Sequence, residues 1–176
     1  MITNSKYVTL LGRAANVLAA VPWVAQWTFN NNGQDSIGAN HLTNNNSATF
    51  TDGKLGGATG ATQLVAASSQ YWSIADNAAL QAGADTTILA WVYLDTLTNY
   101  RVFVNKGHYA SYMDYYLSYD QYWNVFNFSI SNTYVQASSF GVPPTSTWIL
   151  VAAWADRNEG TINIQINNGA VNSAAG

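Results

Sequence analysis

The chain has 176 residues, enough for one domain with a buried core, and its 48% hydrophobic content excludes a disordered chain. Only 9% of the residues are charged and the net charge is −3, which excludes the basic surface that nucleic-acid binding requires. The absence of cysteine excludes disulfides, thiolate metal sites and a cysteine nucleophile. No apolar run approaches the ~20 residues of a membrane-spanning helix, so membrane insertion is not expected.

Residues 1–20 differ in composition from the rest of the chain and form the first predicted element. Arg13 and Asn16 interrupt an apolar run that a secretory signal would need unbroken over ~7–15 residues. We therefore expect an N-terminal arm or attachment segment over 1–20, either a short amphipathic helix or a stretch lying on something else. A cleaved signal is the alternative. The domain itself is expected over 21–176.

From residue 21 onward, short runs rich in Val, Ile, Thr, Tyr, Phe and Trp alternate with turn residues, a pattern typical of β-strands. Many short strands with little helix predict an all-β protein built as an antiparallel β-sandwich. The expected strands lie near 22–29, 40–43, 47–51, 61–65, 70–74, 86–94, 100–105, 112–119, 123–130, 133–138, 147–155 and 161–167.

The loop "FNNNGQDSIG" follows the first expected strand and offers oxygen ligands. Asn31, Asn32 and Asp35 lie within it, beside glycines that allow a tight bend. Calcium takes such carboxylate, amide and backbone oxygens. The loop is therefore a candidate Ca²⁺ site, and no other cofactor is expected. The alternative is a loop that only turns the chain.

The stretch "HYASYMDYYLSYDQYW" over 108–123 holds six tyrosines and one tryptophan. Alternate residues of a strand share a face, so Tyr115, Leu117 and Tyr119 are expected to point into the core. Asp114, Tyr116, Ser118 and Asp120 then face water. The predicted core comprises Trp91, Tyr115, Leu117, Phe126, Phe128 and Trp148.

Two turns of the predicted sandwich carry further tyrosines. Because antiparallel hairpins return the chain to the same end of a sandwich, the "KGHYASY" loop and the "SNTY" turn are expected to meet on one rim. Tyr109, Tyr112 and Tyr134 would then lie together, with Tyr116 as the one outward-facing ring of its strand. Aromatic faces with a polar tip suit a sugar or a protein partner, so these four are the predicted ligand-binding residues. The alternative is that these rings only cover the edge of the sandwich.

The acidic residues argue against an enzyme. Glycoside hydrolysis needs two carboxyl groups ~5–10 Å apart. Asp114 and Asp120 share a predicted face, but six residues of strand separate them by ~20 Å. The single glutamate, Glu159, sits in the turn "DRNEGT". The sequence therefore predicts no catalytic residue and no enzymatic activity.

Six segments, taken in order, resemble the laminin-G-like, concanavalin A-like lectin family over residues 21–176. They are "VPWVAQWTFNNNGQDSIGANHLT", "QYWSIADNAALQAGADTTILAWVYL", "VFVNKG", "YYLSY", "STWILVAAWAD" and "INIQINNGAV". The resemblance implies a two-sheet jelly-roll sandwich and non-catalytic binding or adhesion. The acidic clusters of its glucanase relatives and of the legume-lectin metal site are absent. Ser69 and Gln70 stand where relatives often carry aspartates, which counts against a family-type calcium site.

The resemblance also implies one or two further strands after the Asn-Gly hairpin, whereas this sequence ends at "NGAVNSAAG". A sandwich lacking its last strand would leave an open edge near 161–167, and its uncharged residues would not discourage pairing. We expect that edge to pair with another chain, or residues 1–20 to cover it. Partners are therefore expected to bind through residues 1–20 and the C-terminal edge strand.

Three functional classes follow, of which we favour the first. It is a structural or adhesive module on a virion surface, of the phage fibre or decoration type, with glycan binding. The low charge suits assembly into a lattice, and release by lysis would bring an outward-facing domain out of the cell without an export signal. The alternative is a secreted bacterial carbohydrate-binding module, which would be extracellular. The third class, a glycosidase-like enzyme, is the least favoured.

Overall fold

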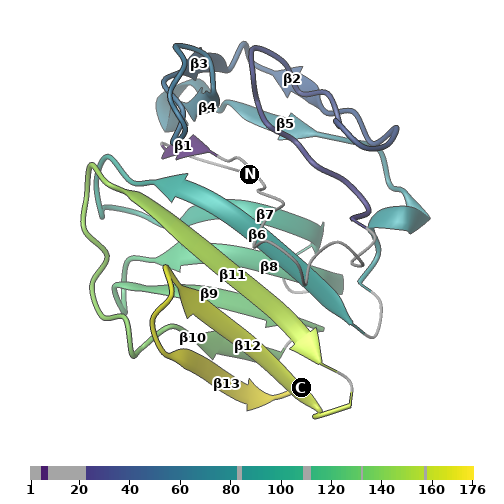
Figure 1. Ribbon diagram of the computed structural model, residues 1–176, viewed down its shortest axis with the longest axis vertical. Coiled ribbons are helices and arrows are strands. Elements are labelled where there is room, and N and C mark those ends of the chain that lie inside the picture. The colour runs from purple at the N-terminus through teal and green to yellow at the C-terminus, as the bar shows by residue number, and fades with distance from the viewer. Residues whose placement is uncertain (1–4, 8–22, 83–84, 109–111, 132, 157) are drawn as a thin grey trace.

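The computed structural model describes residues 5–7, 23–82, 85–108, 112–131, 133–156 and 158–176. Over these residues the chain is an all-β, two-sheet antiparallel sandwich, which confirms the predicted fold class (Figure 1). Apart from strands, the regular elements there are two 3₁₀ turns, η2 (Ala66–Ser68) and η3 (Ala78–Leu80). No helix of the described part is long and apolar enough to cross a membrane.

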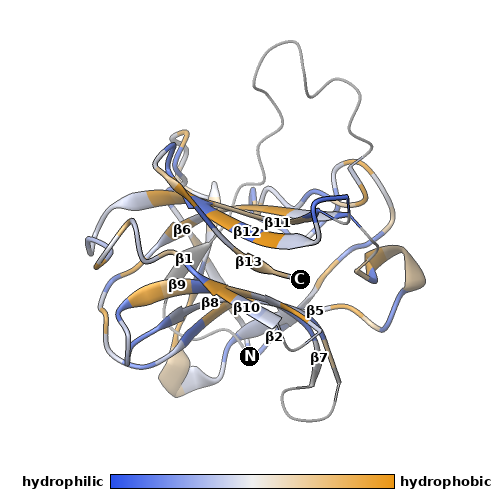
Figure 2. Ribbon diagram, turned by 90° about the horizontal axis from the view of Figure 1, so that it is seen from below, coloured by the Kyte–Doolittle hydropathy of each residue, from blue (hydrophilic) through white to orange (hydrophobic). Residues whose placement is uncertain are grey.

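Two antiparallel sheets form the layers of the sandwich, and Figure 2 shows β11 and β12 in one layer and β8, β9 and β10 in the other. Among the described residues, the larger sheet has the order β13-β12-β11-β6-β1-β4-β3, the second has the order β10-β9-β8-β7, and β2 pairs with β5. In chain order the strands are β1 (Ser5–Tyr7), β2 (Thr43–Asn45), β3 (Thr49–Thr51), β4 (Ala61–Leu64), β5 (Tyr71–Ser73), β6 (Thr86–Tyr93), β7 (Arg101–His108), β8 (Tyr112–Asp120), β9 (Val125–Ile130), β10 (Thr133–Gln136), β11 (Trp148–Asp156), β12 (Thr161–Ile166) and β13 (Val171–Ala175).

The core lies between the inward faces of the two sheets. On the smaller sheet, Leu117 pairs with Phe128 and Tyr119 with Phe126, and all four side chains are fully buried. Small and β-branched residues of β6 and β11 cover them from the other sheet, because every second residue of a strand faces the core. The predictions for Leu117, Phe126 and Phe128 are confirmed.

Trp91 and Trp148 do not belong to this core, so their predicted burial is wrong. Both strands read as apolar in both phases, and alternation alone could not tell inside from outside. The phase that faces the core holds Ala90, Val92 and similar residues, which let the sheets approach. The tryptophans lie half-buried on the outer face, where the Trp148 ring meets Tyr93 edge to face at 5.4 Å. Tyr115 is half-buried too, but it packs against the core, as its predicted phase requires.

The polar phase of β8 was expected to face water, and this too is wrong. Asp114, Ser118 and Asp120 are buried. Both carboxylates accept N–H groups from segments that cross the ends of the strand: Asp114 from Ala82, and Asp120 from Tyr122. Burial of an acid is tolerated where such hydrogen bonds replace water.

The ends of the described chain take part in the larger sheet. Residues 5–7, expected in an arm, form β1 between β6 and β4. β12 pairs with β11 on one side and with β13 on the other, so the expected open edge near 161–167 is wrong. The strand at that edge of the described sheet is β13.

Most expected strands overlap an observed one, but the first does not. Residues 22–29 were expected to form a strand. Within its described part, from residue 23, the only ladder contact is a single bridge between Trp27 and Asp35. Hydrogen bonds to side chains hold this segment instead: Gln26 N donates to Asp35, and the indole of Trp27 donates to the carbonyl of Asn40.

Candidate functional site

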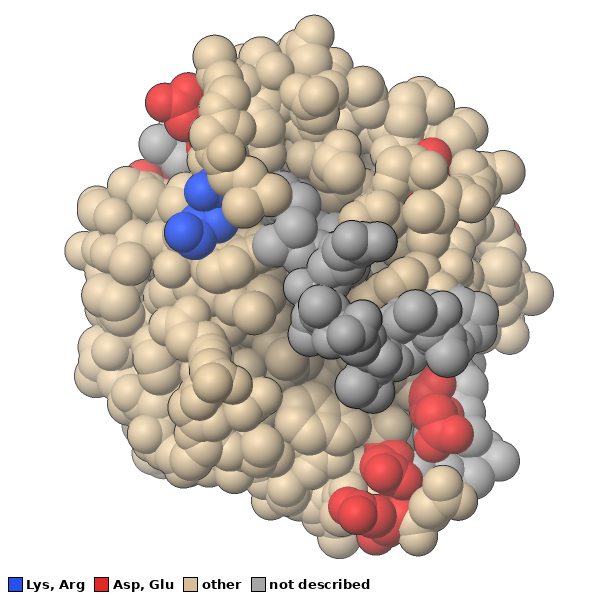
Figure 3. Space-filling view, in the orientation of Figure 1, with Lys and Arg blue, Asp and Glu red and all other residues tan. Residues whose placement is uncertain are grey.

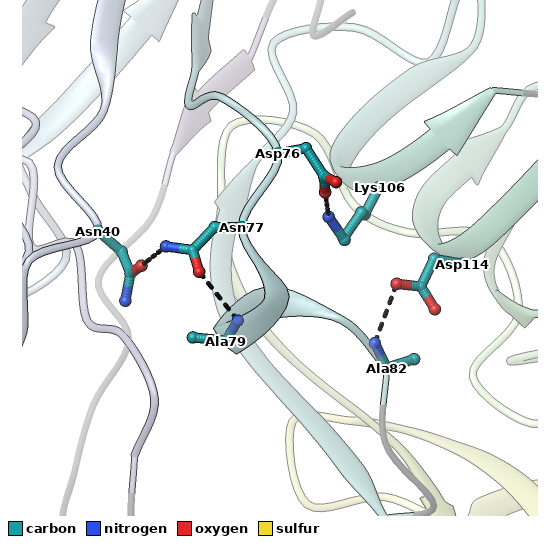
Figure 4. Close-up of polar contacts among 7 residues, drawn as sticks. All are labelled: Asn40, Asp76, Asn77, Ala79, Ala82, Lys106 and Asp114. Carbon is teal, nitrogen blue, oxygen red and sulfur yellow. Dashed lines mark hydrogen bonds and ion pairs between the residues drawn. The ribbon is translucent and has the colours of Figure 1, made fainter.

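A hollow with polar side chains in its lining lies at the end of the smaller sheet, where β7 reaches its last residues. Its volume is about 270 Å³, and Asp76, Gln81, Lys106 and Gly107 line it. Lys106 and Gly107 belong to β7, whereas the other two belong to the segment 76–82 that runs past the strand end (Figure 4). This volume is at the lower end of the range for small-ligand sites, roughly 300–1,000 Å³.

The side chains of Lys106 and Asp76 point toward each other and form an ion pair at the hollow (Figure 4). The Lys106 side chain is 16% exposed, whereas that of Asp76 is 78% exposed. The hydrogen bond from Lys106, together with its positive charge, lowers the pKa of Asp76. A largely buried lysine side chain therefore places its ammonium group beside a carboxylate that remains open to solvent.

A β-bulge shapes the wall of the hollow. Lys106 pairs with Tyr115 and Gly107 with Met113, so Asp114 has no opposite residue. Gly107 has φ +99°, a left-handed conformation that residues with a Cβ rarely adopt. Bulges redirect side chains, and here the carboxylate of Asp114 turns toward the segment 76–82, where its Oδ2 accepts the N–H of Ala82 at 3.0 Å.

A chain of hydrogen bonds holds the segment 76–82 in place. Asn77 caps η3, accepting the N–H of Ala79 at 2.9 Å, and its amide nitrogen donates to Oδ1 of Asn40 at 2.6 Å (Figure 4). The backbone N–H of Asn40 donates in turn to Oδ2 of Asp35 at 3.1 Å. The loop that contains Asp35 therefore positions one wall of the hollow.

The carboxylate of Asp35 holds the backbone of its own loop. Its Oδ1 accepts the N–H groups of Gln26 and Ile37, and its Oδ2 accepts that of Asn40. Burial acts to raise the pKa of Asp35, but these backbone hydrogen bonds together lower it. Its oxygens are thus already used by the loop.

Asn31 and Asn32, the other two predicted ligands, lie exposed on the same loop. The Oδ1 atom of Asn32 accepts the N–H of Gln34 at 2.9 Å, as in an ordinary Asx turn. Within the described ranges, no group of three or more His, Cys, Asp or Glu side chains is placed to hold a metal ion. The hydrogen bonds of this loop position its backbone, and calcium binding by Asp35, Asn31 and Asn32 stays a prediction.

The predicted tyrosines lie near this end of the smaller sheet. Tyr116 and Tyr134 both pair with Ser129, so they lie on one face of the sheet with one strand between them. Two strand spacings correspond to roughly 10 Å. Tyr134 is 64% exposed and Tyr116 is half-buried. Tyr109 lies outside the described residues, as does the side chain of Tyr112.

The two predicted turns approach each other at the start of β8. The N–H of Ser131, in the β9–β10 turn, donates to the carbonyl of Asp114 at 3.3 Å. Gly107, which lines the hollow, pairs with Met113, and the next pair, His108 with Tyr112, is the described end of this hairpin. The row of Tyr116 and Tyr134 and the hollow therefore belong to the same end of the smaller sheet.

Sequence reasoning missed Asp76, Gln81 and Lys106 as site residues. Their positions depend on contacts between distant segments, which neither alternation nor spacing reveals. One signal was present: a glycine inside a strand pattern, here Gly107, often marks a bulge.

The chemistry of the hollow favours binding over proton transfer. A glycosidase acid needs a raised pKa, whereas Lys106 lowers the pKa of Asp76. The groups present can still make hydrogen bonds of every kind. An ammonium donates, a carboxylate accepts, and the Gln81 amide does both. This set can hold a polar molecule through hydrogen bonds.

Comparison of the chain with protein-family models, with curated proteins and with solved structures finds no match. The resemblance to laminin-G-like domains therefore remains a prediction. A β-sandwich alone does not determine function, because many unrelated activities share this architecture. Function has to be argued from the groups at the site.

Proposed function

We propose that this protein is a non-catalytic binding module that recognises neutral glycans at the hollow beside Lys106. In this proposal it acts as an adhesive or structural module on a virion surface, of the phage fibre or decoration type. The observation that carries the proposal is the ion pair of Lys106 and Asp76 at the hollow, because it presents a charged donor and a charged acceptor side by side. Neighbouring hydroxyl groups of a sugar would match this pair.

The surroundings of the hollow support a ring-shaped, uncharged ligand. The hollow of about 270 Å³ suits one sugar unit rather than a large ligand. Tyr134 offers an exposed aromatic face at the same end of the sheet. Aromatic rings with a polar tip bind partners that are partly apolar and partly wet, as sugar rings are.

Charge also favours a neutral ligand. Figure 3 shows a face on which charged groups are sparse and mostly acidic. The whole chain carries six Lys and Arg against nine Asp and Glu. A polyanion such as a nucleic acid gains most of its affinity from many basic contacts, which this composition does not provide.

Assembly partners form the second part of the proposal. β13 is the last strand of the described sheet on its side and carries no charged residue. An edge strand without charged residues can accept a further strand through main-chain hydrogen bonds. We propose that another chain of the assembly pairs with β13, and that residues 1–20 contribute to attachment.

A glycan array of the full chain tests the binding proposal, with Lys106→Met as the site variant. Methionine keeps much of the apolar stem of lysine and removes the ammonium group. Lys54→Met is the matched control, since it makes the same charge change on the exposed turn 54–57, where Lys54 lies over the Trp91 ring.

The expected result is a bound neutral glycan whose affinity falls about tenfold or more in Lys106→Met, as for the loss of a charge-assisted hydrogen bond. Lys54→Met should bind like the parent chain. An array without any bound glycan, or equal binding by both variants, would contradict the proposal.

A further inference from the structure

The turn 121–124 joins β8 to β9 at the end of the smaller sheet that lies away from the hollow, and it exposes two aromatic rings. Tyr122 is 76% exposed and Trp123 is 63% exposed. Their rings meet edge to face, with centroids 5.1 Å apart and planes at 79°. Tyr100, which precedes β7, is a third exposed ring at 48%. Small polar residues usually fill such turns, and grouped exposed rings mark binding surfaces.

One buried carboxylate positions all three aromatic residues. Asp120 is 6% exposed, and its Oδ1 accepts the backbone N–H groups of Tyr122 at 2.8 Å and Trp123 at 3.4 Å. Its Oδ2 accepts the hydroxyl of Tyr100 at 3.0 Å and the amide of Asn127 at 3.3 Å. These hydrogen bonds therefore fix the backbone of the turn that carries the rings of Tyr122 and Trp123.

Further hydrogen bonds secure the turn from the inside and from the neighbouring loop. The buried Tyr119 hydroxyl donates to Oδ1 of Asn124 at 2.8 Å, and the N–H of Asn99 donates to Oε1 of Gln121. A turn ordered before binding loses little conformational freedom when a ligand arrives. Exposed rings on such an ordered turn are suited to recognition.

The groups around the rings indicate the class of ligand. The turn 121–124 and the loop 95–100, which a hydrogen bond from Asn99 to Gln121 joins, carry amides and a hydroxyl: Thr98, Asn99, Gln121 and Asn124. These segments contain no Lys or Arg, and the neighbouring Arg101, at the start of β7, is 1% exposed and bonds to the carbonyl of Tyr100 and the hydroxyl of Thr96. A phosphate or sulfate group would find no exposed positive charge here.

We propose that the turn 121–124 is a second glycan-binding site, at which a neutral pyranose chain stacks on the exposed ring of Trp123, with Tyr122 standing nearly perpendicular beside it. The apolar C–H face of the sugar covers the Trp123 ring, and its hydroxyl groups bond to the amides of the same turn. This site goes beyond the function proposed for the hollow. β8 separates the two by nine residues, roughly 30 Å, so either can bind without the other.

Native affinity electrophoresis of the full chain tests this site, in gels that contain hydroxyethyl cellulose, galactomannan, xylan or dextran. The parent chain is expected to be retarded in at least one gel. Trp123→Ala should weaken that retardation about thirtyfold, as for the central ring of an interface, and Trp123→Phe should keep part of it. Leu55→Ala is the control, because Leu55 is an exposed apolar residue on another turn.

Because both rings are exposed, the melting temperature should stay unchanged in Trp123→Ala, which separates loss of binding from loss of fold. The proposal is overturned if the parent chain is retarded in none of the four gels. Equal retardation of Trp123→Ala and the parent chain also overturns it. Loss of retardation in Lys106→Met alone would assign the binding to the hollow and reject this turn, whereas loss in Trp123→Ala alone would do the reverse.

Discussion

Asp76 and Lys106 lie 30 residues apart in the chain, yet their side chains form an ion pair across the hollow at the end of β7. The pair joins a strand of the smaller sheet to a segment that runs past its end. The exposed partner, Asp76, is the one whose pKa is lowered. The hollow thus presents a solvent-accessible carboxylate, that of Asp76, next to the positive charge of Lys106.

The ion pair predicts a measurable titration. In the intact chain the carboxyl of Asp76 should titrate below its ordinary pKa of 3.8, and in Lys106→Met it should return to that value. A lowered pKa adds stability above pH 3.8, which is lost as the pH falls through the lower, folded value. Side-chain NMR titration of both proteins measures this. Identical midpoints would mean that the pair does not form in solution.

Tyr115 predicts a loss of stability at high pH. Burial, and then the charge of Asp114, raise the pKa of Tyr115 from 10.0 to about 12. The neutral ring therefore contributes stability that is fully present below pH 10 and is lost as the pH rises toward 12. Urea unfolding between pH 9 and 12 should show a smaller alkaline loss in Tyr115→Phe than in the parent chain. An unchanged pH dependence would show that Tyr115 does not ionise at a raised pKa.

The two faces of the sandwich predict different costs of truncation. Phe128→Ala should lower the free energy of unfolding by about 3–5 kcal/mol, because Phe128 is fully buried between the sheets. Trp91→Ala should cost less, since Trp91 is only half-buried and lies on the outer face. Chemical denaturation measures both. If Trp91→Ala lowered the free energy of unfolding more than Phe128→Ala does, the assignment of the core to the space between the two sheets would be contradicted.

β13 predicts a pattern of hydrogen exchange. In the isolated chain, alternate amides of 171–175 should exchange quickly, because one side of this strand ends the described sheet. Amides of 161–166 should be well protected, because β12 is paired on both sides. In the native assembly, protection should rise at 171–175. Unchanged exchange at 171–175 in the assembly would exclude this edge as the interface.

The fold class was predictable because a strand has a local signature in the sequence, an alternation of apolar and polar residues. Leu117, Phe126 and Phe128 alternate with polar residues, so their phase could be assigned. Trp91 and Trp148 could not be assigned, because their strands are apolar in both phases and only the packing of the second sheet decides which phase is buried. β13, "VNSAA", lacks the β-branched and aromatic pattern of a strand, and its pairing with β12 overrides that weak propensity.

The candidate site was less predictable, for a different reason. Tyr116 and Tyr134 could be placed at one end of a sheet from strand alternation and hairpin geometry. Lys106, Asp76 and Asp114 come together through a bulge and a loop that crosses a strand end. Such contacts depend on the register of pairing and on distant hydrogen bonds, and no short stretch of sequence encodes them.

The most direct test of the central claim is NMR mapping of the full chain with a neutral glycan identified on the array. Glycan binding at the hollow predicts shifts in the signals of Asp76, Gln81, Lys106 and Gly107 that saturate with glycan concentration, while the Leu55 signals stay fixed. Lys106→Met should lose the shifts at the hollow. If the bound glycan moves none of these four signals, the assignment of the hollow as the glycan site is contradicted.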